Sequence, residues 1–312
     1  MKRCLITGAT GAIGPAAVSA FFDAGYRVRV LSRKPVARDD IETVVGDLLD
    51  PSAETATRDI DVVIHLAARL HTLEQPADEF ERINVEGTRR LLAAAIESGV
   101  PRFVFASTIA VYGSGNGVIV DESTPPAPDT PYRRTKLEGE KLVLGTRIGV
   151  VLRLASVYGP HVKGNYRNLV KAIDRRRYVP VGSGHNRRTL VHEYDLGRAL
   201  LLAAESNAVA GSVFNVTDGR FYALRDIVDA IASAVGGKPF RFHVPLFVAR
   251  AGAAALDLVR PSMHARELLD KYVEDLAVDG SRFQRAAGFV PRIDLMSGWD
   301  ATVRGLRADG AL

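Results

Sequence analysis

The chain has 312 residues, 47% of them hydrophobic and 25% charged, and its formal net charge is +5 at pH 7. This composition is typical of a globular protein and excludes a disordered or fibrous chain, and the length favours two lobes. Basic residues are scattered among the acids, which argues against nucleic acid as a ligand and suits an anionic small molecule. The single cysteine, Cys4, excludes a disulfide framework and a cysteine-rich metal site.

The first 160 residues alternate short apolar runs with helical patterns. Strands are predicted at 3–7, 28–31, 43–45, 61–66, 102–106 and 149–154, and helices at 13–24, 79–99 and 131–144. This alternation predicts the α/β class, with a Rossmann-type, doubly wound parallel sheet. Ligands of such a sheet bind at the carboxyl ends of its strands.

After residue 160 the pattern becomes mostly helical. Strands are predicted at 188–192 and 212–216, and helices at 195–206, 224–235, 246–259 and 263–276. We predict a dinucleotide-binding domain of residues 1–160 plus about 187–212, and a smaller substrate lobe of about 161–186 and 213–312. The longest apolar tract, 246–258, is too short to span a bilayer, and no signal peptide precedes the first strand. We expect a cytoplasmic protein without membrane insertion.

Three glycines, Gly8, Gly11 and Gly14, lie between the first strand and the first helix. Gly8 and Gly11 allow close approach of a pyrophosphate, Gly14 allows the helix to pack on the strand, and the helix N-terminus favours negative charge. The sequence therefore predicts a dinucleotide site. Its residues in this turn are Gly8, Thr10, Gly11, Ala12, Ile13 and Gly14.

The second strand ends on Ser32-Arg33-Lys34, where NAD-binding sites usually have a carboxylate for the ribose hydroxyl. Arg33 is suited to clamp a 2′-phosphate and Ser32 to donate a hydrogen bond to it, so NADP(H) is favoured and NAD(H) is the alternative. After the third strand, Asp47 is a candidate to accept a hydrogen bond from the adenine amine, or else a turn residue. The adjacent Leu48 is also a candidate cofactor-binding residue.

Tyr132 and Lys136 are four residues apart on a predicted helix and so share a face. A neighbouring ammonium stabilises a phenolate, which allows Tyr132 to move a proton to or from a carbinol oxygen. Thr108, after the fifth strand, is a candidate to donate a hydrogen bond to that oxygen, with Ser107 as the alternative. No metal ligand set is predicted.

Together these segments resemble the extended short-chain dehydrogenase/reductase superfamily, of the NAD-dependent epimerase/dehydratase type. The motifs that carry the resemblance lie at 7–14, 46–48, 65–68, 84–88, 107–113, 132–136 and 152–160. The resemblance implies a homodimer and a cofactor wall formed by Leu66, Ala67 and Ala68. His65 begins the same stretch, but a lone histidine is more often structural, so no acid–base role is assigned to it. Asn84 is expected to support the site structurally.

Two further segments resemble enzymes of nucleotide sugars. Arg188, in Arg-Thr-Leu-Val-His, matches the arginine that grips a sugar-nucleotide diphosphate, and Asn165 matches a substrate loop. The likeness is greatest to bacterial reductases of UDP-4-keto-6-deoxy-N-acetylhexosamines in O-antigen synthesis. Ser32 favours a 4-ketoreductase over a 4-epimerase, and Ile109-Ala110 disfavours a dehydratase. A reductase of an apolar ketone and a non-catalytic dinucleotide sensor remain alternatives, and the sugar, the base and the C4 stereochemistry stay open.

Overall fold

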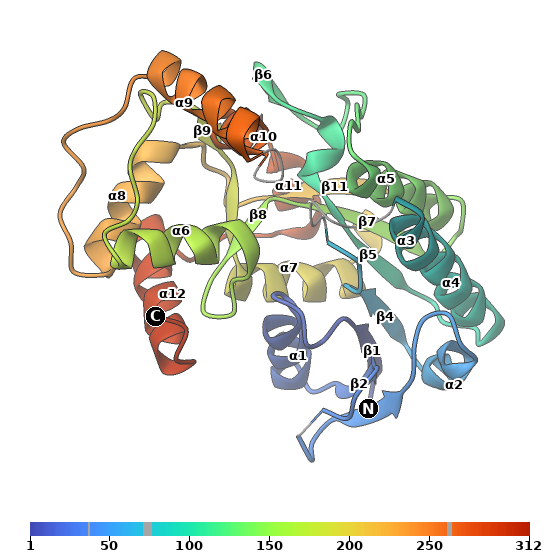
Figure 1. The fold of residues 1–312 in the computed structure, drawn as a ribbon. Helices are drawn as coiled ribbons and strands as arrows, with labels where there is room; N and C mark the ends of the chain where they lie inside the picture. The colour runs from blue at the N-terminus through green and yellow to red at the C-terminus, as the bar shows by residue number, and fades with distance from the viewer. Residues whose placement is uncertain (37, 71–76, 261–263) are drawn as a thin grey trace.

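The computed structural model describes residues 1–36, 38–70, 77–260 and 264–312 (Figure 1). A seven-stranded sheet with the order β11-β7-β5-β4-β1-β2-β3 forms its centre. Its strands are β1 (Arg3–Thr7), β2 (Arg27–Ser32), β3 (Glu42–Val45), β4 (Val62–His65), β5 (Phe103–Thr108), β7 (Gly149–Leu154) and β11 (Val213–Val216). Every neighbouring pair is parallel, which confirms the predicted Rossmann-type sheet.

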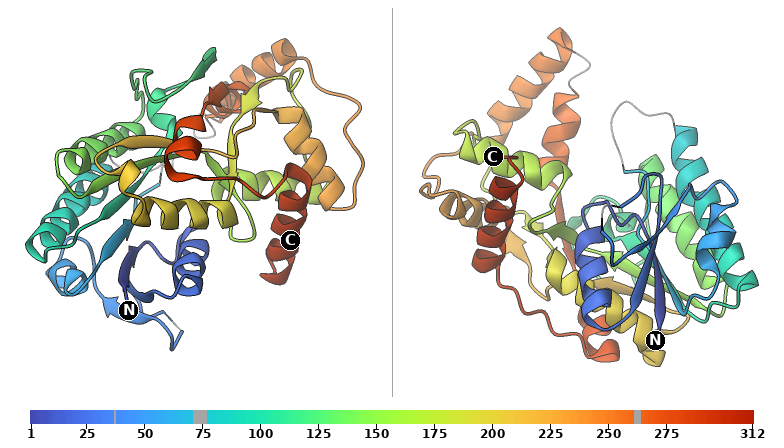
Figure 2. Two further views of the ribbon diagram at one scale, coloured as in Figure 1. Left: turned by 180° about the vertical axis from the view of Figure 1, so that it is seen from behind. Right: turned by 90° about the horizontal axis from the view of Figure 1, so that it is seen from below.

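Helices cover both faces of this sheet (Figure 2). On one face α1 (Gly14–Asp23) packs against α7 (Glu193–Glu205), and their apolar residues share a core with Cys4 and Ile6 of β1. On the other face, the core around Leu5 includes α2 (Ser52–Thr57), α4 (Gly87–Glu97) and α5 (Pro131–Leu144). Alternate residues of a strand point to opposite faces, so β1 contributes to both cores.

Several smaller elements complete the first domain and join it to the second lobe. They are α3 (Ala77–Phe80), the π-helical turn η1 (Glu81–Glu86), the 3₁₀ turns η2 (Ile109–Tyr112) and η3 (Asn207–Val209), and the pairs β8 (Ser156–Tyr158) with β10 (Leu190–His192) and β9 (Arg187–Arg188) with β12 (Tyr222–Ala223). In the second lobe, α6 (Gly164–Asp174), α8 (Leu224–Ala234) and α12 (Leu295–Ala308) surround a core that contains Tyr158 and Trp299. Helices α9 (Leu246–Val259) and α10 (Ala265–Val273) pack against each other at the top of the view in Figure 1.

The C-terminal third returns to the first lobe more often than the sequence predicts. β11, assigned above to the substrate lobe, pairs with β7 instead, because Phe214 and Val216 are buried in the first-lobe core. The predicted helix at 263–276 begins outside the described residues and ends at Val273. Its last residues form β13 (Asp275–Val278), which pairs with β6 (Asn116–Val120), and α11 (Ser281–Ala287) then packs Phe283 against Phe214.

Among the described residues, no helix is both long and apolar enough to cross a membrane.

Candidate active site

Glycines shape the turn between β1 and α1, because a side chain at Gly8 or Gly14 would collide with neighbouring backbone atoms. It holds the predicted residues Gly8, Thr10, Gly11, Ala12, Ile13 and Gly14. Gly8 has a φ of +73°, and a Cβ there would lie 2.7 Å from the backbone nitrogen of Ala67. A Cβ on Gly14 would lie 2.0 Å from the carbonyl oxygen of Ala9, inside the turn rather than on the strand as predicted. The glycines keep the turn compact, with its backbone available to an approaching phosphate.

The start of α1 fits the pyrophosphate of a dinucleotide. The helix has Pro15 in its first turn, and the residue at its N-cap, Ile13, has no side-chain atom that could accept a hydrogen bond from the first N–H groups. The N–H groups of the first turn and the positive end of the helix dipole therefore face the glycine turn. Lys163 adds a cation beside it, because its Nζ donates to the carbonyl oxygen of Thr10 at 2.8 Å. No local pattern indicates this contact, since 153 positions separate the two residues.

The residues predicted to select the cofactor lie at the end of β2 and after β3. Arg33 is exposed, while Ser32 is partly buried, with its hydroxyl oxygen 3.5 Å from the backbone nitrogen of Lys34. The side chain of Asp47 holds its own turn, because Oδ1 accepts a hydrogen bond from the nitrogen of Leu49 at 3.2 Å. The geometry supports the turn role for Asp47, and its contact to adenine stays a prediction.

Leu66, Ala67 and Ala68 follow β4 directly beside the glycine turn. The nitrogen of Ala67 donates to Oγ1 of Thr7 at 3.2 Å, which fixes this stretch against the end of β1. Leu48 is buried, and a Cβ on Gly87 at the start of α4 would lie 3.1 Å from its Cβ. The predicted cofactor wall thus lies at the carboxyl end of β4, beside the glycine turn. Leu48, also a predicted cofactor contact, packs mainly against the start of α4.

His65 and Asn84 connect elements beneath the site. The His65 ring bridges Thr7 Oγ1 at 2.7 Å and Thr88 Oγ1 at 2.9 Å, and burial lowers its pKa to about 3. It is therefore neutral at physiological pH, which fits the absence of an acid–base role. Asn84, in the π-helical turn η1, donates through Nδ2 to Oγ1 of Thr135 at 3.1 Å and so supports α5.

One cavity of about 690 Å³ brings together predicted residues from four separate segments. Thr108 lies at the end of β5, Tyr132 at the start of α5, Asn165 at the start of α6 and Arg188 on β9, and all four line this cavity. Its walls come from both lobes and include residues of α10. The cavity is the candidate active site.

Tyr132 and Lys136 are positioned by the start of α5. Thr130 caps the helix through its hydroxyl, which accepts from the nitrogen of Arg133 at 3.3 Å, and Pro131 occupies the first turn. Lys136 is 2% exposed, with Nζ 4.0 Å from the centroid of the Phe105 ring. Burial lowers the pKa of Lys136 to about 7, opposed by the charge of the nearby Glu140, and burial raises the pKa of Tyr132 to about 12. In the polypeptide alone, Tyr132 is therefore a protonated phenol at neutral pH.

The two hydroxyl residues at the end of β5 have different surroundings. Thr108 is partly exposed in the cavity, and its Oγ1 accepts from the nitrogen of Ala110 at 3.2 Å, which leaves its O–H as a donor. Ser107 is 4% exposed and donates to Oε1 of Glu140 at 2.5 Å. It is not among the residues that line the cavity, so this placement does not support the predicted substrate contact of Ser107.

A buried ion pair lies behind Lys136. Arg153 donates to Glu140 through Nε at 3.0 Å and through a terminal nitrogen at 2.7 Å, and both side chains are at most 6% exposed. The other terminal nitrogen of Arg153 donates to the hydroxyl of Tyr112 at 2.9 Å. The sequence predicts neither residue, although Glu140 lies one helical turn after Lys136.

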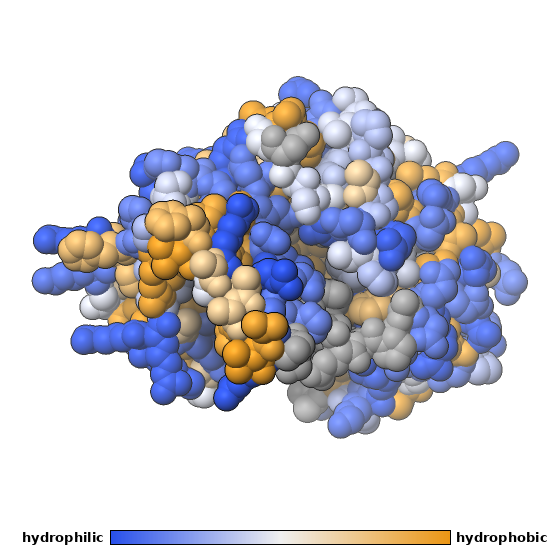
Figure 3. Space-filling view, turned by 45° about the horizontal axis from the view of Figure 1, so that its top comes forward, coloured by the Kyte–Doolittle hydropathy of each residue, from blue (hydrophilic) through white to orange (hydrophobic). Residues whose placement is uncertain are grey.

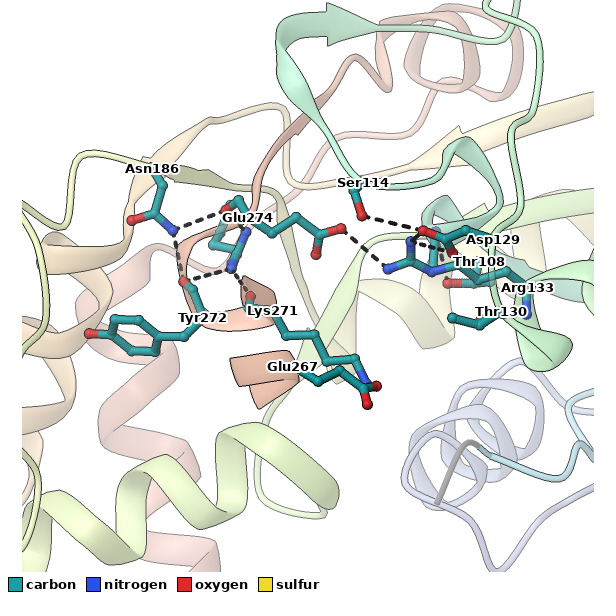
Figure 4. Close-up of polar contacts among 12 residues, drawn as sticks. Thr108, Ser114, Asp129, Thr130, Arg133, Asn186, Glu267, Lys271, Tyr272 and Glu274 are labelled. Atoms are coloured by element: carbon teal, nitrogen blue, oxygen red, sulfur yellow. Dashed lines mark hydrogen bonds and ion pairs between the residues drawn. The ribbon is translucent and has the colours of Figure 1, made fainter. Parts of the chain in front are cut away.

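Arg188 contacts the C-terminal end of α10. Its terminal nitrogens donate to the carbonyl oxygens of Lys271 at 2.7 Å, Tyr272 at 3.0 Å and Glu274. Asn186 donates to two of the same oxygens, those of Tyr272 and Glu274, at 3.0 Å each (Figure 4). Arg188 thus lines the cavity as predicted, while it also holds α10 in place.

Arg133 joins α5 to the same end of α10. It pairs with Asp129 at 2.9 Å and with Glu274 at 3.2 Å (Figure 4). The sequence contains the Asp129–Arg133 spacing of four residues, which indicates the first pair but not the second. A second, more open cavity of about 950 Å³ shares with the first the wall formed by Thr130, Arg133, Lys271 and Glu274.

The part of the chain that the structure describes contains no group of three or more His, Cys, Asp or Glu side chains able to hold a metal ion.

The parallel sheet, the glycine turn and the helix of Tyr132 and Lys136 define a dinucleotide-dependent enzyme of the short-chain dehydrogenase/reductase class. Residues 4–217 match the model of the NAD dependent epimerase/dehydratase family. The chain belongs to this family.

Three proteins illustrate the likeness over nearly full length. The UDP-glucose 4-epimerase of Vibrio cholerae is 29% identical over 318 residues, covering 97% of this chain and 95% of that protein. The 4-hydroxy-2-methyl-3-oxo-4-farnesyl-3,4-dihydroquinoline-1-oxide ketoreductase of Stigmatella aurantiaca is 28% identical, with 96% and 95% covered. The structure of MoeE5 in complex with UDP-glucose and NAD has a TM-score of 0.78 at 27% identity, with 98% and 99% covered.

Proposed function

We propose that this protein is an NADP(H)-dependent reductase of nucleotide-diphosphate 4-keto sugars that serves surface polysaccharide synthesis. The observation that carries the proposal is the single cavity into which Thr108, Tyr132, Asn165 and Arg188 converge. A proton donor and a cationic fork thus share one space of about 690 Å³. The likeness to a UDP-glucose 4-epimerase and to a protein that binds UDP-glucose supports a sugar nucleotide as the ligand.

The chain's own groups fit reduction of a carbonyl. The glycine turn between β1 and α1 would hold the dinucleotide, which when bound would be the source of the hydride for the carbonyl carbon. Tyr132 donates its phenolic proton to the C4 oxygen, so that the ketone becomes an alcohol and Tyr132 becomes a phenolate. The raised pKa of Tyr132 keeps that proton in place before the reaction. Thr108 donates a hydrogen bond to the same oxygen, and Lys136, a helical turn away, favours the phenolate electrostatically when it is protonated.

A 4-epimerase is the alternative reading of the same site. It is supported by the Vibrio cholerae relative and by the NAD bound to MoeE5. The end of β2 favours the reductase, because it suits NADP(H). Ser32 and Arg33 provide no carboxylate for a ribose hydroxyl, whereas the exposed guanidinium of Arg33 can bind a 2′-phosphate. A homodimer in the cytoplasm remains a prediction.

A reductase of an apolar ketone is a second candidate, and one specific observation favours it. The cavity is lined by large apolar side chains, among them Leu169, Leu224 and Leu268, which suit an apolar substrate. The Stigmatella aurantiaca relative is named for a farnesylated ketone. A UDP-sugar that fails to raise the melting temperature would favour this candidate, since a ligand at 100 times its Kd adds about 2.7 kcal/mol.

Net consumption of NADPH tests the proposed reaction. With a UDP-4-keto sugar we expect NADPH to be oxidised while mass spectrometry shows a product two hydrogens heavier. Arg33→Ala is expected to weaken NADPH binding by about 10- to 100-fold and NADH binding little, because only NADPH carries the 2′-phosphate. Lys34→Ala, which changes the neighbouring exposed cation, is the control. Retained NAD and interconversion of UDP-sugar epimers without net oxidation would establish the epimerase, and equal effects on both dinucleotides would remove the 2′-phosphate contact.

Arg188→Ala tests the diphosphate contact. We expect the KM for the UDP-sugar to rise by about 10- to 100-fold with kcat less changed, because the diphosphate is held equally in the ground and transition states. Asn186→Ala is the matched control, since it removes hydrogen bonds to the same α10 carbonyls without removing a charge from the cavity. An equal rise of KM in both variants would mean that Arg188 acts by holding α10.

A further inference from the structure

The outward face of α9 is apolar along its whole length. Phe247 is 75% exposed, Leu258 85% and Val259 77%, and none of the helix's residues is buried. The positions 247, 251, 254 and 258 follow one another at three- and four-residue spacing, as do 248, 252, 255 and 259, so they form one broad stripe. Every residue of the stripe is apolar, whereas surface helices of globular proteins usually turn polar residues to water.

The opposite face of α9 is already used. Its partly buried residues Leu246, Ala249, Ala253 and Asp257 recur every three or four positions, and α9 packs against α10. Asp257 accepts hydrogen bonds from the nitrogen of Ala265 at 2.6 Å and from Nε of Arg266 at 2.9 Å. These bonds fix the rotation of the helix, so the apolar stripe stays directed outward.

The segment that carries the stripe is basic. Between residues 238 and 260 the cations are Lys238, Arg241, Arg250 and Arg260, all exposed, and the single acid is Asp257, which faces α10. Next to Arg241, Phe242 is 88% exposed and extends the apolar surface into the segment before the helix. Figure 3 shows this surface as a band of apolar residues over α9. We call Phe242, Phe247, Val248, Leu258 and Val259 with these four cations the α9 surface.

We propose that the α9 surface docks on a membrane that contains anionic lipids. Its apolar side chains would enter the boundary between headgroups and acyl chains, and its cations would contact the headgroup phosphates. A second copy of this chain is a poorer partner. In a two-fold dimer each α9 surface meets itself, which brings like charges together. The proposal rests on this surface alone and not on the proposed function.

Docking has a consequence for the candidate active site. Leu268, Lys271 and Tyr272 of α10 line the cavity, and α10 is the helix on which α9 packs. A protein held by its α9 surface therefore presents this side of the cavity next to the membrane.

Sedimentation of the full-length protein with lipid vesicles tests the proposal. We expect it to pellet with vesicles of phosphatidylcholine mixed with phosphatidylglycerol and to stay in solution with phosphatidylcholine alone. The double variant Phe247→Asp, Leu258→Asp should abolish pelleting. Arg241→Gln with Arg250→Gln should lower the partition coefficient by about 25-fold, from roughly fivefold for each of the two basic residues. Salt should weaken binding in the unaltered protein.

Val290→Asp is the matched control, because Val290 is an apolar residue 64% exposed outside the α9 surface, and it should leave pelleting unchanged. Thermal unfolding checks that each variant is folded. Failure of the unaltered protein to pellet, or equal pelleting of the Phe247→Asp, Leu258→Asp variant, would overturn the proposal. So would a dimer, seen by light scattering, that this variant dissociates, since the surface would then bind a second copy. Oxidoreductase activity on a water-soluble substrate is measured separately, so its absence would bear on the proposed function alone.

Discussion

Replacing Tyr132 with Phe is expected to lower turnover by about 10²- to 10⁴-fold while dinucleotide affinity stays near that of the unaltered protein. The change removes one hydroxyl and keeps the ring, so the shape of the cavity is preserved. In the proposed reaction this hydroxyl donates the proton to the C4 oxygen, and burial raises its pKa to about 12. Steady-state rates and fluorescence titration with NADPH measure the two quantities.

Tyr166→Phe is the matched control for this experiment. Tyr166 lines the same cavity, and burial also raises its pKa to about 12. Its ring packs against Trp299 with 5.5 Å between centroids, which indicates a role in the wall of the cavity. Equal losses in the two variants would mean that any phenol lost from the cavity impairs the enzyme. A Tyr132→Phe variant that no longer binds the dinucleotide would give Tyr132 a structural role.

The elements with strong local signals could be predicted closely. The helices Pro131–Leu144 and Leu246–Val259 and the strand Gly149–Leu154 have the bounds that their sequence patterns predict. Prolines begin the first helix, and the six residues of the strand are all buried, as an apolar run in a parallel sheet requires. The alternation of strands and helices was likewise sufficient to predict the Rossmann-type sheet.

Contacts between distant segments could not be predicted in the same way. Ser107 and Thr108 are adjacent on β5, so their side chains point to opposite faces of the sheet. Ser107 contacts Glu140 on α5 and Thr108 lines the cavity, and only the tertiary structure shows which of the two faces the ligand. From the sequence, Arg188 is a candidate to bind a phosphate, while its contacts with the end of α10 are to residues 83 or more positions later in the chain. The local pattern identifies the residue types of the site, and tertiary packing decides which of them face the ligand.

Arg153→Met is expected to lower the free energy of unfolding by about 3–5 kcal/mol, because it leaves the carboxylate of Glu140 buried without its ion-pair partner. Glu140 is 1% exposed, so water does not replace the guanidinium. Methionine fills much of the same volume, which limits any cavity term. Urea denaturation followed by circular dichroism measures the change.

Arg29→Met is the matched control, because it removes another buried arginine whose partner differs. Arg29 pairs with Glu42 at 2.8 Å, and the Glu42 side chain is 57% exposed, so water hydrates that carboxylate when the pair is broken. Arg29 also contacts two backbone carbonyl oxygens, of which only the contact with Ala56 is buried, and leaving that oxygen unpaired costs about 1–3 kcal/mol. Adding Glu140→Gln to Arg153→Met should recover part of the loss, since it removes the unpaired charge. Equal losses for the two arginines, or no recovery in the double variant, would mean that the buried charge of Glu140 does not determine the cost.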